Sequence, residues 1–379
     1  MKKYRIKSKN ILNSTIKEGF VYFQGGVITD VTQNELDFDQ EINVGDNFLS
    51  AGFIDCHTHG AFGHDFSDCD ADGVVKACNY HFMHGTTAIL PTTLSLDKKS
   101  ILLSLENVEK AMKSCELLCE ILGAHLEGPY FSPVQAGAQN PDFITEPIEK
   151  DYIEIIKRYG GIIKKWSYAP ERDANEKFFD CLSKNNIVAS VGHSNATFDQ
   201  LKTAIQKGLK NVTHLYSCTS TITRDKGFRH LGVVETAYLC DDFFVELIAD
   251  GKHVPADLIK LAFKLKGANK IMLVTDSLPA TGSGEARGNI GGIDFIIEDG
   301  VAKLSDRSAF AGSVSTMDVL IKQCVGAGVS LNDAVLSATK TPADSLGIKK
   351  GRIEVGYDAD FVIFDKDINV LKVISKGRI

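Results

Sequence analysis

The sequence predicts an α/β fold, a (β/α)8 barrel of the TIM type with a small β-sandwich domain formed by both chain termini. Three observations lead to this prediction: eight short apolar runs alternate with helical stretches in the middle of the chain, polar residues close many of these runs, and both ends carry alternating strand patterns. Eight parallel strands are the number that closes such a barrel. The runs cover residues 51–57, 86–91, 121–127, 162–169, 187–193, 212–215, 244–250 and 271–276.

The two ends of the chain are alike and differ from the middle. Residues 4–45 contain short period-2 runs broken by glycine, such as 19–23 and 25–28, and residues 351–364 repeat this style. Such runs are typical of antiparallel strands. We therefore expect a β-sandwich domain from residues 1–50 and 345–379 and a barrel domain from residues 51–344. Residues 288–305 are expected to form an inserted hairpin after the eighth barrel strand.

The composition is that of a globular protein with enough apolar residues for a full core. Apolar residues make up 44% of the chain and charged residues 24%. The net charge of −7 argues against a nucleic-acid-binding protein, and any anionic substrate would need a local basic pocket. Nine scattered cysteines, an odd number without a CxxC pair, indicate free thiols. Because no run approaches the roughly 18 apolar residues of a membrane span and no signal peptide is evident, we expect a cytoplasmic protein.

Metal-binding side chains stand at the ends of several predicted barrel strands. His57 and His59 lie two apart on the first strand and therefore point to the same side. Glu127 ends the third strand, and His193 and His214 end the fifth and sixth. Each residue alone has an ordinary alternative, as a loop cap or a satisfied barrel histidine. Because the carboxyl ends of barrel strands converge on one mouth, the five together favour a site for zinc, iron, cobalt or manganese.

These motifs resemble the amidohydrolase superfamily and, within it, the N-acetylglucosamine-6-phosphate deacetylases. The likeness covers essentially the whole chain in the right order. The HxH motif at 57–59 is a signal of the superfamily, whereas Leu-Glu-Gly-Pro at 126–129 together with Ile-Ala-Asp-Gly-x-His at 248–253 is specific to the deacetylases. The other matching stretches are residues 51–60, 191–194, 213–216, 273–276, 311–313 and the tail 351–365.

The resemblance implies one or two divalent transition-metal ions per subunit. Glu127, His193 and His214 are the implied ligands of the principal metal, and His57 with His59 could hold a second ion. Related enzymes that bridge two metals carry a carboxylated lysine on the fourth strand. In this sequence Lys164 and Lys165 lie too early on that strand, so Glu127 on the third strand is the better carboxylate ligand.

The implied reaction is hydrolysis of the acetamide of N-acetylglucosamine 6-phosphate to acetate and glucosamine 6-phosphate by a metal-activated hydroxide. Asp276 closes the eighth strand and could otherwise be a helix N-cap. The resemblance implies that Asp276 takes the proton of the water and then delivers it to the departing amine.

The resemblance also implies the substrate contacts. His253 and Arg224 are the implied phosphate ligands, reaching across the interface of a homodimer, with the backbone of Ser217 and Cys218 nearby. The loop that lines the sugar pocket is implied to contain Phe310, Ala311 and Gly312.

Two departures from the family pattern bear on the substrate. Many members have a histidine in the loop after the third strand, where this chain has Ala138 and Gln139. Glutamine can donate a hydrogen bond to the substrate carbonyl but cannot carry a proton. After His214, Ser217-Cys218 replaces the usual Asn-Ala, and the segment to Arg224 is one residue shorter.

Other functions stay open on the sequence alone. The substrate could be N-acetylgalactosamine 6-phosphate or an unphosphorylated acetylated amino sugar. A D-aminoacylase-like enzyme acting on N-acyl amino acids would need one basic anchor and no phosphate pocket. An inactive barrel serving as a scaffold would have lost ligands or the catalytic acid, and all of them are present in this sequence.

Overall fold

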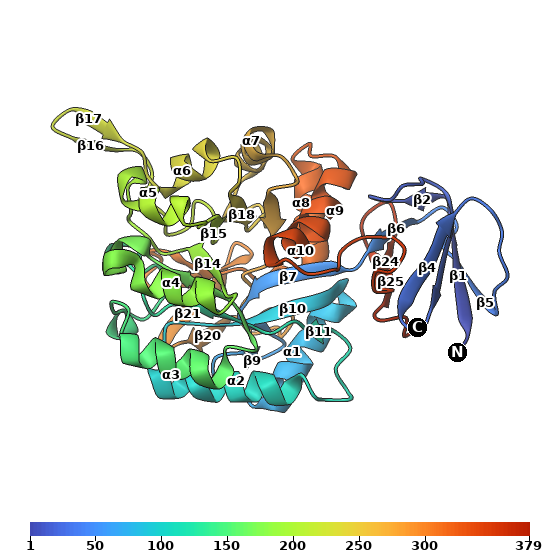
Figure 1. The fold of residues 1–379 in the computed structure, drawn as a ribbon, viewed down its shortest axis with the longest axis horizontal. Coiled ribbons are helices and arrows are strands. Elements are labelled where there is room, and N and C mark those ends of the chain that lie inside the picture. Colours follow the sequence, from blue (N-terminus) through green and yellow to red (C-terminus); the bar gives the residue numbers. More distant parts are fainter.

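The computed structural model describes residues 1–379, and its centre is a ring of eight parallel strands (Figure 1). Each strand pairs with the next one along the chain, in parallel. The ring is completed beyond the last strand, where the Asp276 N–H donates to the His57 carbonyl at 2.9 Å. The predicted eight-stranded barrel is confirmed. Its strands are β7 (Phe53–Thr58), β10 (Thr86–Thr93), β12 (Ala124–Glu127), β13 (Ile163–Tyr168), β14 (Val188–Val191), β15 (Asn211–Val212), β18 (Phe244–Leu247) and β19 (Ile271–Leu273).

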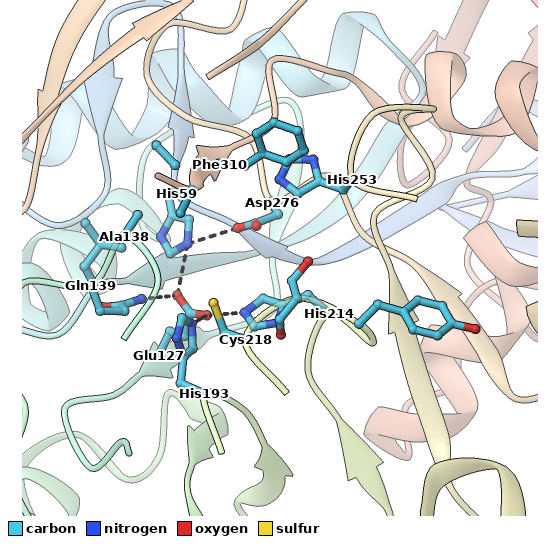
Figure 2. A pocket seen from close by; sticks show the side chains of 16 residues that line it. His59, Glu127, Ala138, Gln139, His193, His214, Cys218, His253, Asp276 and Phe310 are labelled. Carbon is cyan, nitrogen blue, oxygen red and sulfur yellow. Dashed lines mark hydrogen bonds and ion pairs between the residues drawn. The ribbon is translucent and has the colours of Figure 1, made fainter. Parts of the chain in front are cut away.

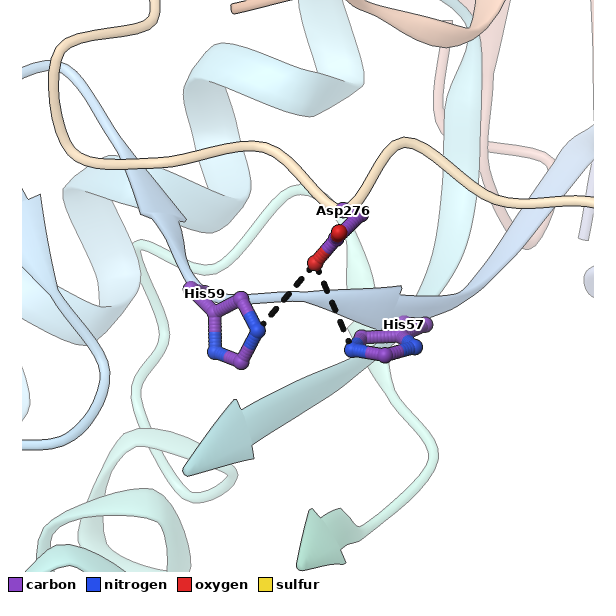
Figure 3. Close-up of side chains that lie close together, drawn as sticks. All are labelled: His57, His59 and Asp276. Atoms are coloured by element: carbon purple, nitrogen blue, oxygen red, sulfur yellow. Dashed lines mark ion pairs between the residues drawn. The ribbon is translucent and has the colours of Figure 1, made fainter. Parts of the chain in front are cut away.

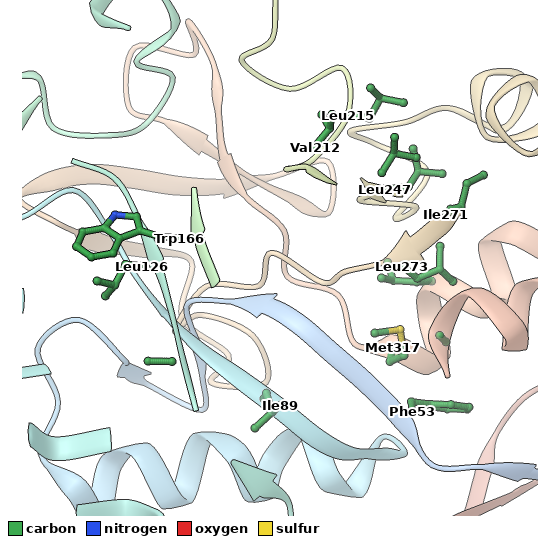
Figure 4. Close-up of a cluster of buried hydrophobic side chains, with 14 of the residues drawn as sticks. Phe53, Ile89, Leu126, Trp166, Val212, Leu215, Leu247, Ile271, Leu273 and Met317 are labelled. Carbon is green, nitrogen blue, oxygen red and sulfur yellow. The ribbon is translucent and has the colours of Figure 1, made fainter. Parts of the chain in front are cut away.

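Helices surround the ring and bury one face each against it. In α2, for example, Ile101, Leu105 and Val108 recur at helical spacing and are all buried, and Asp97 caps the helix by accepting from the Lys99 and Ser100 N–H groups. Figure 4 shows part of the core between strands and helices, with Trp166 as its largest side chain. The helices are α1 (Ala71–Met83), α2 (Lys98–Ala111), α3 (Glu149–Tyr159), α4 (Lys177–Lys184), α5 (Phe198–Gln206), α6 (Val233–Leu239), α7 (Ala256–Lys266), α8 (Met317–Gly326), α9 (Leu331–Ala338) and α10 (Lys340–Leu346).

Both chain termini contribute to two four-stranded sheets beside the barrel, at the right in Figure 1. One sheet contains β1 (Lys3–Ser8), β3 (Gly19–Gln24), β4 (Val27–Thr32) and β5 (Gln40–Asn43). The other joins β2 (Asn10–Ile11) and β6 (Phe48–Ala51) to β24 (Phe361–Phe364) and β25 (Val370–Ile374). A small core that includes Ile6, Val21, Leu49 and Phe361 lies between the sheets. The division of the chain into domains at residues 50 and 345 remains a prediction.

The insertion after the eighth strand is larger than the predicted hairpin. It is a four-stranded antiparallel sheet of β20 (Arg287–Ile290), β21 (Ile293–Glu298), β22 (Val301–Leu304) and β23 (Phe310–Gly312). Its own apolar cluster, which includes Ile290 and Phe295, packs on Leu94 and Leu278 of the barrel loops. This packing brings β23 to the mouth of the barrel.

Several shorter elements lie in the connections. The hairpin of β16 (Thr223–Asp225) and β17 (Phe228–His230) projects away from the barrel, at the upper left of Figure 1. The others are β8 (Gly60–Ala61), β9 (His64–Asp65), β11 (Glu120–Ile121) and the single-turn 3-10 helices Pro133–Gln135, Pro141–Phe143, Pro170–Arg172 and Ala174–Glu176. No helix of the chain is both long enough and apolar enough to span a membrane.

Candidate active site at the barrel mouth

A cavity of about 290 Å³ opens where the barrel strands end, and most of the predicted site residues line it (Figure 2). Of the predicted set, His57 and Arg224 alone do not line it: His57 is fully buried below the cavity, and Arg224 is exposed on the projecting hairpin. Leu94, Tyr216 and Ala309 also line the cavity and were not predicted from the sequence. The predicted residues on its wall are His59, Glu127, Ala138, Gln139, His193, His214, Ser217, Cys218, His253, Asp276, Phe310, Ala311 and Gly312.

Two groups of three metal-binding side chains meet at the floor of this cavity. In the first group, Glu127 Oε1 lies 2.9 Å from His214 Nε2 and 3.2 Å from His193 Nε2. In the second group, Asp276 Oδ1 lies 3.2 Å from His59 Nε2 and 3.4 Å from His57 Nε2 (Figure 3). Within each group the ligand atoms all lie within 4.8 Å of one another. Glu127 also joins the groups, because its Oε2 is 3.2 Å from His59 Nε2.

The four imidazoles are oriented so that each turns Nε2 toward the centre. His59 Nδ1 donates to the Thr92 carbonyl at 3.2 Å, His193 Nδ1 to Gln135 at 2.8 Å, and His214 Nδ1 to Ser217 at 3.1 Å. His57 Nδ1 lies 2.9 Å from a carboxylate oxygen of Glu246.

A hydrogen bond donated by Nδ1–H leaves the lone pair of an imidazole on Nε2, which is the arrangement found in metal-binding histidines. His57 Nε2 is buried and has no hydrogen-bond partner. This donor set of imidazole and carboxylate groups fits a divalent transition metal.

The backbone at the site is strained in a way the sequence analysis did not anticipate. His193, His214, Cys218 and Asp276 have φ angles of 46°, 27°, 48° and 47°, in the left-handed region that non-glycine residues avoid. Such conformations persist only where the surrounding structure enforces them, and they concentrate at functional sites. His193, His214 and Asp276 come two or three residues after the ends of β14, β15 and β19, so the turn out of each strand aims the side chain at the mouth.

Ionisation in the group follows from burial and from close opposite charges. Burial disfavours charge on His59, but the carboxylates of Asp276 and Glu127 raise the pKa of His59 to about 10. Burial also works against ionised carboxylates, but His57 and the other histidines lower the pKa of Glu127 well below its usual range. His57 and His59 likewise lower the pKa of Asp276 against the effect of burial. Both carboxyl groups are therefore anionic near neutral pH.

Gln139 is held by two groups of its own chain. Its side-chain amide donates to Glu127 Oε2 at 2.7 Å, and its oxygen accepts from the Ser95 N–H at 2.7 Å. One amide N–H therefore holds the Glu127 carboxylate, and donation of the second N–H to a substrate carbonyl stays a prediction.

The outer wall of the cavity carries His253. The side chain of His253 is held at Nδ1 by Asp250 Oδ2 at 2.8 Å, and Phe310 packs edge-on against its ring at a centroid distance of 4.9 Å. Elsewhere on the wall, Cys218 fills the space beside Gly137, because a Cβ atom added to Gly137 would lie 2.4 Å from Cys218 Sγ. The cavity wall contains no lysine or arginine of the same chain.

Two charged residues inside the barrel, below the histidines, were also missed. Lys165 of β13 and Glu246 of β18 form a fully buried ion pair. Burial lowers the pKa of Lys165 to about 8, against the effect of nearby acidic groups. A single charge within an otherwise apolar strand, the segment Phe244–Leu247, is the signal that could have identified Glu246, because charged side chains are almost never fully buried without a partner. The strand of Lys165 has a second lysine and gives no such signal.

Comparisons with known proteins agree with this geometry. Residues 48–379 match the model of the Amidohydrolase family. The chain is 35% identical to N-acetylglucosamine-6-phosphate deacetylase of Bacillus subtilis, covering 97% of this chain and 94% of the relative, and 33% identical to the Lysinibacillus sphaericus protein of that name, covering 88% and 85%.

Solved structures are similar over the whole chain. A Mycobacterium smegmatis N-acetyl-D-glucosamine-6-phosphate deacetylase variant, in complex with N-acetyl-D-glucosamine-6-phosphate, has a TM-score of 0.92 at 25% identity and covers 100% of this chain and 99% of its own. The Thermotoga maritima enzyme has a TM-score of 0.87 at 30% identity, covering 99% and 98%. The resemblance noted in the sequence is confirmed: this chain belongs to the amidohydrolase family.

Proposed function

We propose that this protein is a metal-dependent hydrolase that removes the acetyl group of N-acetylglucosamine 6-phosphate, giving glucosamine 6-phosphate and acetate. The observation that carries the proposal is that Glu127, His193, His214 and Asp276 lie together at the floor of one cavity. Relatives that match over nearly the whole chain are named for this activity. The same relatives favour this substrate over N-acyl amino acids and over an inactive scaffold.

Glu127, His193 and His214 are the proposed ligands of the principal metal. His57, His59 and Asp276 form a second group that could hold another ion, so one or two ions of zinc, iron, cobalt or manganese are proposed per subunit. A divalent ion bound here would act as a Lewis acid toward the acetamide carbonyl and would lower the pKa of a water molecule.

Asp276 is the proposed general base and acid. Its Oδ1 faces the cavity beside the imidazoles of His57 and His59, so it can accept the proton of a water molecule there. After attack on the acetamide carbon, the same carboxyl group would deliver that proton to the sugar nitrogen as the carbon–nitrogen bond breaks. Burial and the ordered backbone around Asp276 keep this carboxylate in place for both steps.

The substrate phosphate is proposed to bind at the outer wall, near His253 and the backbone of Ser217 and Cys218. Ala138, Gln139 and the loop of Phe310, Ala311 and Gly312 are proposed to line the sugar. Because the wall holds no lysine or arginine of its own chain, we propose that Arg224 of a second copy completes the phosphate site in a homodimer. Arg224 is exposed on the β16–β17 hairpin, and Phe228 of the same hairpin is 73% exposed, which is compatible with such a contact. A cytoplasmic location is also proposed, since all nine cysteines are free thiols.

The experiment that tests this function is acetate release from four compounds, with and without a chelator. They are N-acetylglucosamine 6-phosphate, its unphosphorylated form, N-acetylgalactosamine 6-phosphate and an N-acetyl amino acid. We expect chelator-sensitive turnover that is strongest for the first compound and restored by adding back a divalent metal. Turnover of the N-acetyl amino acid in preference to both phosphorylated sugars would contradict the proposal.

A further inference from the structure

The interior of the barrel contains a charged pair that the proposed reaction does not use. Lys165 and Glu246 reach into the ring from opposite sides of the paired strands β14 and β15, and their side chains are 2% and 0% exposed. The interior of such barrels is ordinarily filled with branched apolar residues. Removing two charges from water is costly, and their attraction repays the cost only when further hydrogen bonds satisfy them.

Glu246 also accepts hydrogen bonds from two of the proposed metal-binding residues. Its Oε2 accepts from His57 Nδ1–H at 2.9 Å and from the backbone N–H of His214 at 3.1 Å. Its Oε1 faces Lys165 and lies 3.9 Å from the Cys56 thiol. Lys165 thus supplies the counter-charge, and Glu246 connects it to two of the four histidines.

His57 differs from the other three histidines in the nature of its partner. His59, His193 and His214 donate Nδ1–H to neutral main-chain carbonyls, whereas His57 donates to a carboxylate. A carboxylate acceptor fixes the tautomer and ring orientation of a metal-binding imidazole and makes it a stronger ligand. At the same time, His57 Nε2 has no hydrogen-bond partner of its own and lies 3.4 Å from Asp276 Oδ1 and 3.5 Å from Glu127 Oε1.

We propose that Lys165 and Glu246 are a positioning pair that holds His57 ready to bind metal and thereby sets the metal affinity of the His57–His59–Asp276 group. Glu246 fixes the His57 ring, and Lys165 keeps Glu246 in place as a buried carboxylate. The inference rests on the metal dependence proposed above. It assigns a role to two residues that contact neither substrate nor metal.

Two electroneutral double variants separate positioning from folding. K165M/E246Q removes both charges but keeps an oxygen that can accept from His57 Nδ1–H, whereas K165M/E246L removes both charges and the acceptor. The single variant K165M leaves Glu246 without a counter-charge. K164M is the matched control, since Lys164 is the neighbouring, partly exposed lysine of the same strand.

The measurement is Co²⁺ titration of the metal-free proteins, followed by visible absorption and by competition with a chelator. We expect K164M to bind Co²⁺ like the unmodified protein. K165M/E246Q keeps the acceptor that orients His57 but loses the carboxylate charge, so it should be weakened much less than K165M/E246L. In K165M/E246L, the ion bound by the His57 group should bind about 10- to 100-fold more weakly, the usual effect of losing an outer partner of a metal ligand. K165M should be weakened too, and adding E246Q should restore part of the affinity.

The outcomes distinguish this inference from the proposed function. Equal Co²⁺ affinity and equal spectra for K165M/E246L and K165M/E246Q would overturn the positioning role while leaving the metal site intact. An unmodified protein that binds no Co²⁺ would overturn the metal proposal and this inference together. Because the comparison rests on the two electroneutral variants, it holds even if K165M alone does not fold.

Discussion

Two regions of this protein bring acidic or imidazole side chains close enough together to bind a metal ion. The regions differ in the groups that neutralise the negative charge of the carboxylates. At the barrel mouth, carboxylates face imidazoles, and no lysine or arginine lines the cavity. Near the β-sandwich, Glu120, Asp358 and Asp360 form a group of the same size, but Lys350 Nζ lies within it, at 2.7, 2.5 and 2.8 Å from the three carboxylates.

The contrast shows why proximity of ligand atoms does not by itself identify a metal site. The carboxylates around Lys350 already have a cation, the lysine ammonium of the same chain. Lys350 links Glu120 of β11, which pairs with barrel strand β10, to Asp360 beside β24 of the β-sandwich. The mouth has imidazoles, which unlike the lysine ammonium can give up a proton and bind a metal ion through Nε2, and each is held so that Nε2 faces inward. A bound cation is therefore expected at the mouth and not around Lys350, and the following experiments test that difference in order of expected effect.

The largest effect is expected from Asp276→Asn. The amide keeps the size of the side chain but cannot accept and deliver a proton, so kcat should fall by about 10²- to 10⁴-fold, the usual contribution of general acid–base catalysis. The principal metal held by Glu127, His193 and His214 should be retained, so elemental analysis should still find a bound ion in this variant. Full activity in this variant would remove Asp276 from the mechanism.

A smaller effect, on stability and not on catalysis, is expected from Lys350→Met. The substitution leaves Asp358 and Asp360 without a cation and Glu120 with Lys376 alone, and breaking a buried pair in this way is destabilising. Because Glu120 and Asp358 are partly exposed, we expect a loss of about 2 kcal/mol in the free energy of unfolding, with unchanged kcat and metal content. Lys366→Met, at an exposed position, is the control.

The pH dependence of that loss follows from Lys350 and its carboxylate partners. Burial opposes it, but the carboxylates of Asp360, Asp358 and Glu120 raise the pKa of Lys350 above 10.5, so the stability from Lys350 is present below that value and fades as pH rises through the raised pKa. Against the effect of burial, Lys350 lowers the pKa of Glu120 below 4.5, so this contribution is present above 4.5 and is lost as pH falls through the lowered pKa. Burial raises the pKa of Asp360 although Lys350 lowers it, so Asp360 is protonated early as pH falls and the loss becomes smaller. Urea unfolding should therefore show the largest difference between the two proteins from about pH 7 to 10 and a smaller one in acid. A difference that grows in acid would contradict this account.

The smallest effect is expected from Gln139→Met. This variant removes the 2.7 Å hydrogen bond that holds Glu127 Oε2, at similar side-chain volume. The affinity for the principal metal should fall by about tenfold, near the lower limit for loss of an outer partner. Gln135→Met is a matched control, because His193 contacts only the backbone carbonyl of Gln135. Metal titration of the two variants measures the difference, and equal affinities would assign Gln139 to the substrate side instead.

Much of the site could be predicted because it depends on local patterns in the chain. Short apolar runs define the barrel strands, and side chains two apart on a strand share a side, so His57 and His59 were expected to point the same way. Parallel strands in a barrel end at one mouth, which places Glu127, His193 and His214 together although they lie far apart in the sequence. These inferences need only the period of a strand and the geometry of a closed ring.

The tertiary structure alone decided what lies between those residues. Two contacts could not be predicted, the bond from Gln139 to Glu127 and the ion pair of Lys165 with Glu246, because the local sequence does not identify either partner. The left-handed backbone at His193, His214 and Asp276 likewise has no signal in the local sequence. The insertion likewise became a four-stranded sheet because its apolar side chains pack on barrel loops that are distant in sequence. Local sequence determines where a strand ends and which side chain it presents. The partner that orients the side chain comes from another strand of the ring, so only the folded chain determines it.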